Sequence, residues 1–123
     1  EEYKKTAKDL VDYNTVQMLE GEDLKAGKNI WDQNCVVCHM ADGGGGIGPN
    51  MTDDYYILGG GIKNIFKTIS EGGRPGKGME AWSKKGLRAS QIAQVSSYIV
   101  TLNGTTPANP KEPEGELWKN NEE

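Results

Sequence analysis

The pentapeptide Cys35-Val36-Val37-Cys38-His39 constrains this chain more than any other feature of the sequence. It contains both cysteines and the single histidine of the 123 residues. Because the second thiol follows the first by three positions, the two lie about one helical turn apart, and the imidazole comes directly after them. Any chemistry that needs cysteine or histidine must therefore occur at this point.

This spacing is the signature of covalent c-type haem attachment. Cys35 and Cys38 can each add to one haem vinyl group, and His39 can then present a ring nitrogen to the iron. A structural disulfide between the two cysteines remains open. A thioredoxin-like dithiol usually follows a strand of a βαβ unit, which is missing before Cys35, and a zinc site needs more ligands than the chain offers. We predict one covalent haem c, bound by Cys35 and Cys38 and ligated by His39.

Methionine is the usual second axial ligand in electron-transfer cytochromes c, and the chain has four: Met18, Met40, Met51 and Met79. Met40 adjoins His39 and cannot reach the opposite face of the ring. Met18 precedes the segment that delivers the cysteines and would need a long return path.

Met79 lies in a glycine-containing loop before the last expected helix, from which a thioether can approach the iron. We predict Met79 as the distal ligand. Met51, which follows Gly48-Pro49-Asn50, is the second candidate, and a site with no second protein ligand is the remaining alternative.

Apolar residues recurring at three- and four-residue steps predict three helices. The first runs from about residue 22 to Asn34, and the second carries the stripe from Ile62 to Ile69 and ends at Gly72-Gly73. The last begins after Ser90, expected as its N-cap, and Gly104 stops it. Residues 41–49 and 74–87 are expected to be loops.

The ends of the chain lack this periodicity. Residues 1–20 are predicted to be a lead-in segment with room for a single helical turn, and residues 105–123 a Pro-rich polar tail in an extended, polyproline-like conformation. The predicted haem domain is therefore residues 21–104.

Composition narrows the function further. The hydrophobic fraction is 35% and the net charge is −4, so a cofactor would help to fill a thin core, and nucleic acid is not an expected partner. The sequence contains no apolar run of about 20 residues. Because it begins with Glu1, we expect a mature or excised fragment, with membrane attachment only through a segment missing from this chain.

At the motif, at Gly48-Pro49-Asn50-Met51 and at Met79, the sequence resembles the class I cytochrome c superfamily. The resemblance implies an all-α, small cytochrome c fold of three to five helices around one haem, here with the extended Pro-rich tail. It also implies that the Pro49 carbonyl accepts a hydrogen bond from His39. In this family the first and last helices cross at a glycine and aromatic residues, matched here by Gly27, Trp31 and Tyr98.

Residues 50–56, 59–62 and 78–82 are similar to haem domains in the membrane-anchored cytochrome c subunit of cbb-type oxygen reductases, although Glu80 replaces the proline that is more frequent there. This resemblance implies a non-enzymatic, single-electron carrier in the periplasm that delivers electrons toward a haem-copper terminal oxidase. Its partners would be redox proteins, namely other c-type cytochromes and oxidase or dehydrogenase subunits. A free periplasmic shuttle, a dehydrogenase subunit, a haem enzyme or gas sensor with an open distal site, and a dithiol protein without haem are the alternatives.

Overall fold

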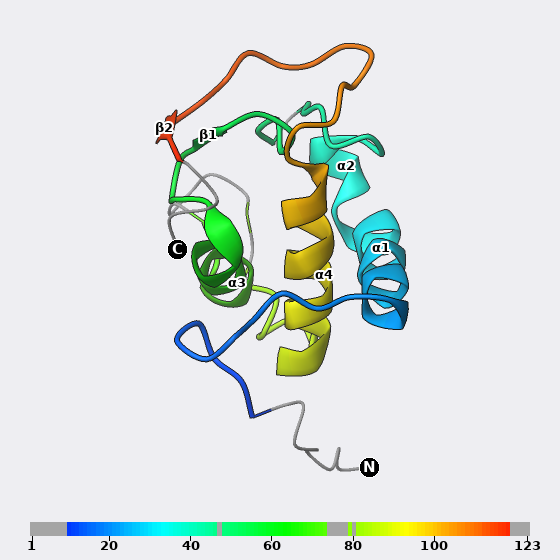
Figure 1. Cartoon of the computed structure of the whole chain (residues 1–123), viewed down its shortest axis with the longest axis vertical. Coiled ribbons are helices and arrows are strands. Elements are labelled where there is room, and N and C mark those ends of the chain that lie inside the picture. Colours follow the sequence, from blue (N-terminus) through cyan, green and yellow to red (C-terminus); the bar gives the residue numbers. More distant parts are fainter. Residues whose placement is uncertain (1–9, 47, 74–78, 80, 119–123) are drawn as a thin grey trace.

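The computed structural model describes residues 10–46, 48–73, 79 and 81–118. In chain order its elements are α1 (Glu22–Asn34), α2 (Val36–His39), β1 (Tyr55–Tyr56), α3 (Gly61–Glu71), α4 (Ala89–Leu102) and β2 (Glu116–Leu117). The three predicted helices are confirmed as α1, α3 and α4, which Figure 1 shows with α4 between the other two. Helix α2 is the single turn formed by the motif itself.

Helix α1 crosses α4 where Gly27 meets Gln94. A Cβ at Gly27 would collide with the Gln94 carbonyl oxygen, so the absence of a side chain allows the two backbones to touch. One turn further along, Trp31 is fully buried, and its ring lies 6.0 Å from that of Tyr98. The expected glycine and aromatic contact between the first and last long helices is confirmed.

The predicted N-cap of the last helix is wrong. Helix α4 begins at Ala89 with Arg88 as its N-cap, and Ser90 lies within the first turn. The Gln91 side chain reaches back three positions and accepts a hydrogen bond from the Arg88 N–H at 2.8 Å. This hydrogen bond caps the helix two residues before the predicted start.

The core lies between α3 and α4 and is closed by Trp31 of α1. The amphipathic stripe of α3 supplies Ile62, Ile65, Phe66 and Ile69, and α4 supplies Ile92, Val95, Ile99 and Leu102. Within the described residues no helix is long and apolar enough to cross a membrane.

The described part of the lead-in segment, residues 10–20, joins this core across α4 (Figure 1). Val16 is only 2% exposed, and the Leu19 N–H donates to Ser97 Oγ of α4 at 3.0 Å. The chain forms one turn at this end, in which the Val16 N–H bonds the Asp12 carbonyl. Residues 1–9 lie outside the described residues.

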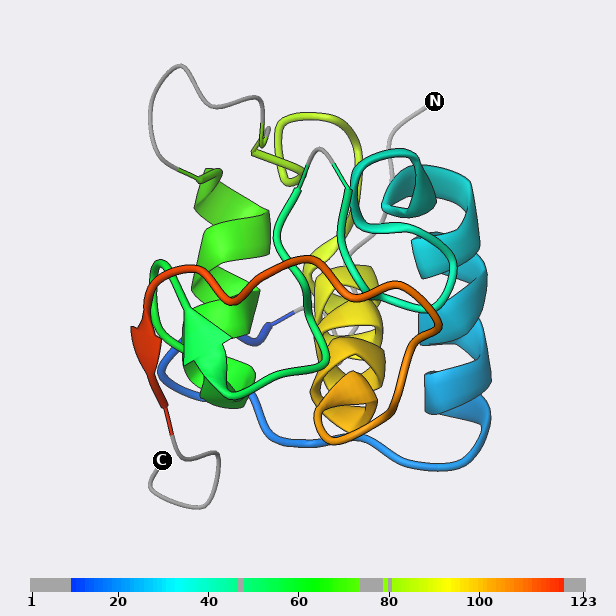
Figure 2. The same cartoon turned by 90° about the horizontal axis from the view of Figure 1, so that it is seen from above.

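The Pro-rich tail is extended, as predicted, and its described part lies against the molecule. After α4, residues 105–118 run across the loop of residues 41–56, and β2 then pairs antiparallel with β1 (Figure 2). The Trp118 N–H bonds the Asp54 carbonyl at 2.7 Å just beyond that pair. We call residues 105–118 the strap.

Candidate haem site

The two cysteines lie where α1 passes into α2. Cys35 caps α1, and its N–H bonds the Trp31 carbonyl at 2.9 Å. The N–H groups of Cys38 and His39 both return to the Cys35 carbonyl, so the motif forms one tight helical turn. The two cysteines form no disulfide with each other, and both are partly buried. Two thiols one turn apart, followed by an imidazole, are the donor set that covalent haem attachment requires.

His39 is oriented by a hydrogen bond to the next loop. Its Nδ1 lies 2.8 Å from the Pro49 carbonyl oxygen. Because a carbonyl can only accept, Nδ1 must carry the proton, and Nε2 then keeps its lone pair. This is the hydrogen bond that the resemblance assigns to Pro49, and it fixes both the tautomer and the direction of the ring.

Two further contacts hold the imidazole in place. The Gly48 backbone lies directly on the ring, and a Cβ there would come 2.6 Å from His39 Cε1. The buried indole of Trp31 lies with its centroid 5.9 Å from the imidazole, tilted by 31°. The Gly45 N–H also bonds the His39 carbonyl at 3.0 Å, which holds the main chain of His39 against the following loop.

The environment favours a neutral imidazole. Burial lowers the pKa of His39 from its ordinary value, the positive charge of Lys111 lowers it further, and the Pro49 hydrogen bond opposes both. A metal ligand must be unprotonated at the donor nitrogen, so the direction of this shift suits ligation by Nε2. The residues on this side of the site therefore fit the iron of a haem.

The environment of Cys35 disfavours a thiolate. Burial raises the pKa of the Cys35 thiol to about 11, with the neighbouring Cys38 as the second cause. A catalytic dithiol needs the opposite shift, because the thiolate is the nucleophile. Cys35 is therefore poorly suited to a thioredoxin-like redox reaction in this environment.

Met79 comes from the segment between α3 and α4. Its carbonyl accepts the Gly73 N–H at 3.1 Å, and its half-buried side chain packs against the core. Further along, the Trp82 N–H bonds the Ile69 carbonyl at 2.8 Å. Residues 74–78 and Glu80, which belong to the predicted ligand loop, lie outside the described residues.

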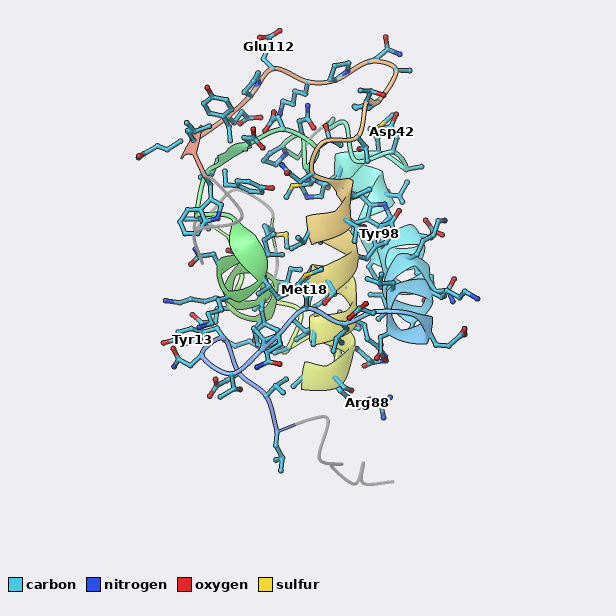
Figure 3. The ribbon with its side chains drawn as sticks, viewed as in Figure 1. Tyr13, Met18, Asp42, Arg88, Tyr98 and Glu112 are labelled. Carbon is cyan, nitrogen blue, oxygen red and sulfur yellow. The ribbon has the colours of Figure 1, made fainter. Side chains whose placement is uncertain are left out.

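The other methionines differ in exposure. Met40 is 51% exposed and occupies a backbone conformation with φ of 67° at the end of α2. Met18 is 41% exposed and lies on the lead-in segment where it passes α4 (Figure 3). Met51 is partly buried against the core, and its N–H bonds the Gly43 carbonyl. Met51 is thus partly buried like Met79 and stays the second candidate for the distal ligand.

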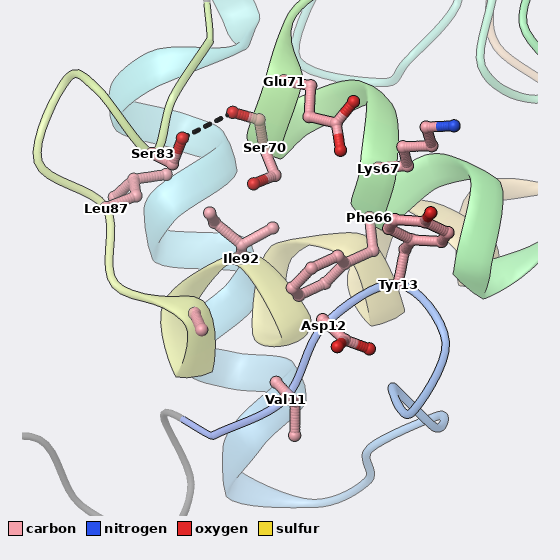
Figure 4. Close-up of a pocket in the computed structure, with 11 residues that line it drawn as sticks. Val11, Asp12, Tyr13, Phe66, Lys67, Ser70, Glu71, Ser83, Leu87 and Ile92 are labelled. Carbon is pink, nitrogen blue, oxygen red and sulfur yellow. Dashed lines mark hydrogen bonds between the residues drawn. The ribbon is translucent and has the colours of Figure 1, made fainter.

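A pocket of about 230 Å³ lies where residues 11–13 of the lead-in segment meet α3 and the start of α4 (Figure 4). None of the predicted site residues lines it. Its walls are Val11, Asp12, Tyr13, Phe66, Lys67, Ser70, Glu71, Ser83, Leu87, Ala89 and Ile92. A hydrogen bond from Ser83 Oγ to the Ser70 carbonyl crosses its rim at 2.7 Å, and the Lys67 ammonium lies over the Tyr13 ring.

Sequence reasoning missed two residues that support His39. Gly48 was named only within the segment Gly48-Pro49-Asn50-Met51, with no contact assigned to it, although its contact with the imidazole requires glycine. Lys111 was part of a polar tail with no assigned contact, yet its N–H bonds the Gly44 carbonyl at 2.8 Å. The run of three prolines around Lys111 was the available signal, since prolines favour an extended chain that can lie along another segment.

Comparison with known proteins identifies the family of this chain. Residues 22–99 match the family described as cytochrome C oxidase, cbb3-type, subunit III. The cbb3-type cytochrome c oxidase subunit CcoP of Azospirillum sp. (strain B510) is 39% identical over 97 residues, covering 70% of this chain and 33% of that protein. The subunit FixP of Bradyrhizobium diazoefficiens is 36% identical over 86 residues, covering 63% of this chain and 30% of the relative.

A solved structure, cytochrome CL from the marine methylotrophic bacterium Methylophaga aminisulfidivorans, superposes with a TM-score of 0.64 at 25% identity. The match covers 82% of this chain and 69% of that one. The chain spans about a third of the length of the curated relatives that it matches. It belongs to the family of cbb3-type cytochrome c oxidase subunit III and has a small cytochrome c fold.

Proposed function

We propose that this chain is a mono-haem electron carrier in which Cys35 and Cys38 hold the haem covalently, and His39 and Met79 ligate its iron. The observation that carries the proposal is the oriented His39 ring, whose Nδ1 proton is committed to Pro49 and whose Nε2 is left as a donor. The adjacent pair of thiols supports covalent attachment at the same place.

When bound, a haem supplies a reversible one-electron change at iron. The chain holds both ligands through the change, so that no bond to the iron forms or breaks. His39 is fixed by Pro49, Gly48 and Trp31, which limits movement of the ring between the two oxidation states. The thioether of Met79 would be the second protein ligand and would raise the reduction potential of the haem.

The partners follow from the relatives. Proteins named as cbb3-type oxidase subunits match this chain over most of the haem domain, which supports passage of electrons toward a haem-copper oxidase. The donor would be another c-type cytochrome, met through a small and transient interface. A position on the periplasmic side, attached through a segment outside this chain, fits that role.

The distal ligand separates a carrier from an enzyme or gas sensor. If Met79 occupies the sixth position, ferrous protein will not bind carbon monoxide readily and will reduce an oxidised c-type cytochrome in stopped-flow mixing with a rate constant of about 10⁶ M⁻¹s⁻¹. Rapid carbon monoxide binding, with slow electron exchange, would contradict the proposal and favour an open distal site. A preparation without haem, made where haem attachment operates, would favour the dithiol alternative.

A further inference from the structure

The strap lies beyond residues 22–99 that match the family, and it lies against the loop that carries the His39 support. Figure 2 shows it running from the end of α4 across that loop to β2. The strap is anchored at both ends, through the Gly104 N–H to the Thr52 carbonyl at 2.8 Å and through the Trp118 N–H to the Asp54 carbonyl. Between these anchors the strap contacts Gly44, Gly45 and Asn50.

The middle of the strap is bonded to the loop through one residue. The Lys111 N–H donates to the Gly44 carbonyl at 2.8 Å, and Asn50 Nδ2 donates to the Lys111 carbonyl at 3.2 Å. These two hydrogen bonds grip the loop on either side of Pro49. Asn50 is 5% exposed, so its amide would lose a partner in a dry environment if the strap moved away.

The surfaces are also in steric contact. A Cβ at Gly44 would lie 2.9 Å from Pro107 Cβ, and a Cβ at Gly45 would lie 2.9 Å from Lys111 Cβ. Both glycines are needed for the strap to approach so closely, and Gly45 in addition has a φ of 100°. Gly45 itself bonds the His39 carbonyl, so the contact surface reaches the ligand residue.

The path from the strap to the imidazole is short. Asn50 follows Pro49 directly, and its side-chain oxygen is fixed by the Thr52 N–H and hydroxyl at 2.8 and 2.6 Å. The strap thus holds Asn50, whose neighbour Pro49 accepts the hydrogen bond from His39 Nδ1.

We propose that the strap is a positioning element of the proximal haem site, and that Lys111 and Asn50 hold the Pro49 carbonyl on His39. The inference rests on the proposed function, because it assigns the strap a role in tuning the ligand of a bound haem. A firmly held Nδ1–H to Pro49 bond makes the imidazole a stronger donor to iron, which favours the ferric state. Loosening the strap should therefore weaken that bond and raise the reduction potential.

The test compares three substitutions in the full-length holoprotein. Lys111→Pro removes the N–H that bonds Gly44, whereas Lys111→Met removes the same charge and keeps the main chain. Glu112→Pro adds a proline at the next position, where the side chain points away from the molecule (Figure 3) and no described hydrogen bond is donated by the N–H. The readouts are exchange of the His39 Nδ1 proton in the ferrous state, measured by NMR, and the reduction potential.

Lys111→Pro should speed exchange of the His39 Nδ1 proton by about tenfold or more relative to Lys111→Met, and its reduction potential should be the higher of the two. Lys111→Met should lower the potential relative to the unsubstituted protein, because a positive charge near the iron favours the ferrous state. Glu112→Pro should leave proton exchange unchanged. Equal exchange rates in the two Lys111 variants would overturn the proposal.

A second pair of variants tests the contact from the loop side and changes no charge. Gly44→Ala places a methyl group against Pro107 and should raise both proton exchange and reduction potential. Adding Pro107→Gly removes the nearest atoms that the methyl group meets, leaves the Asp42 carboxylate oxygen at 3.1 Å, and should restore both values. This pair tests the proposal even if Lys111→Pro does not fold. Unchanged proton exchange and unchanged reduction potential in Gly44→Ala would also overturn the proposal. A haem-free or histidine-unligated parent protein would instead contradict the proposed function.

Discussion

His39 is held by contacts from several segments, whereas the described contacts of the Met79 segment lead back mainly to α3. On the His39 side, α1 supplies Trp31, the glycine-rich loop supplies Gly48 and Pro49, and the strap grips that loop. On the other side, Gly73, Ile69 and Ser70 at the end of α3 anchor the segment of residues 79–83. We propose that His39 is the more rigidly held ligand and that Met79 is the ligand that is easier to displace, which the following variants test.

The largest expected effect comes from disturbing the rigid side. Gly48→Ala places a Cβ 2.6 Å from His39 Cε1, so the imidazole must turn and lose its bond to Pro49. We expect loss of about 3 kcal/mol in unfolding free energy, together with a sharply lower yield of holoprotein. Chemical denaturation and haem absorbance measure the two effects.

Gly86→Ala is the matched control for this prediction. Gly86 has a positive φ of 105° but open space around its Cβ position, so only the backbone cost of about 1 kcal/mol remains. Similar losses in the two variants would show that the Gly48 contact with His39 is unimportant.

The next effect tests the easily displaced side. Met79→Ala should leave the haem attached and the fold intact, remove the weak far-red absorbance of a ferric methionine–iron bond, and lower the reduction potential by on the order of 0.1 V. Optical redox titration measures both. Met51→Ala should retain the methionine–iron absorbance. If Met51→Ala lost this absorbance and Met79→Ala kept it, Met51 would be the ligand and the assignment would be reversed.

The smallest effect measures how loosely the distal segment is tethered. Ser83→Ala deletes the hydrogen bond to the Ser70 carbonyl, which is worth about 0.5 kcal/mol at this exposed position. Added imidazole, competing with Met79 for ferric iron, should then bind about twofold more tightly. Titration of the haem spectrum with imidazole gives the affinity.

Ser97→Ala serves as the comparison for this small effect. It removes the acceptor of the Leu19 N–H and should cost about 1 kcal/mol in unfolding free energy, because Ser97 is buried. That bond joins the lead-in segment to α4 and does not involve the segment of residues 79–83. Its imidazole affinity should be unchanged. An equal gain in affinity in both serine variants would show that general destabilisation, and not the Ser83 tether, controls access to the iron.

The sequence was informative where function depends on side-chain identity and helical spacing. The motif placed Cys35, Cys38 and His39 on one turn, and the apolar periods gave α1 and α3 nearly to the residue. These features follow from local geometry, which repeats at fixed intervals along the chain.

The strap could not be predicted in the same way. Its hydrogen bonds to Gly44 and Asn50 both use the main chain of Lys111, and main-chain groups leave no pattern of residue types. In the run from Gly43 to Gly46, nothing in the sequence distinguishes Gly44, which touches Pro107, from its neighbours. The packing of the lead-in segment against the core was not predicted for a related reason, since Val16 enters the core from a segment without helical periodicity.

The most direct test of the account is the intact mass of the purified protein, taken together with its oxidised and reduced absorption spectra. We predict a single mass equal to the chain plus one haem, with Cys35 and Cys38 both consumed, and a low-spin spectrum that shows the ferric methionine–iron band. The mass of the bare chain with two free thiols, or a high-spin ferric spectrum, would contradict it.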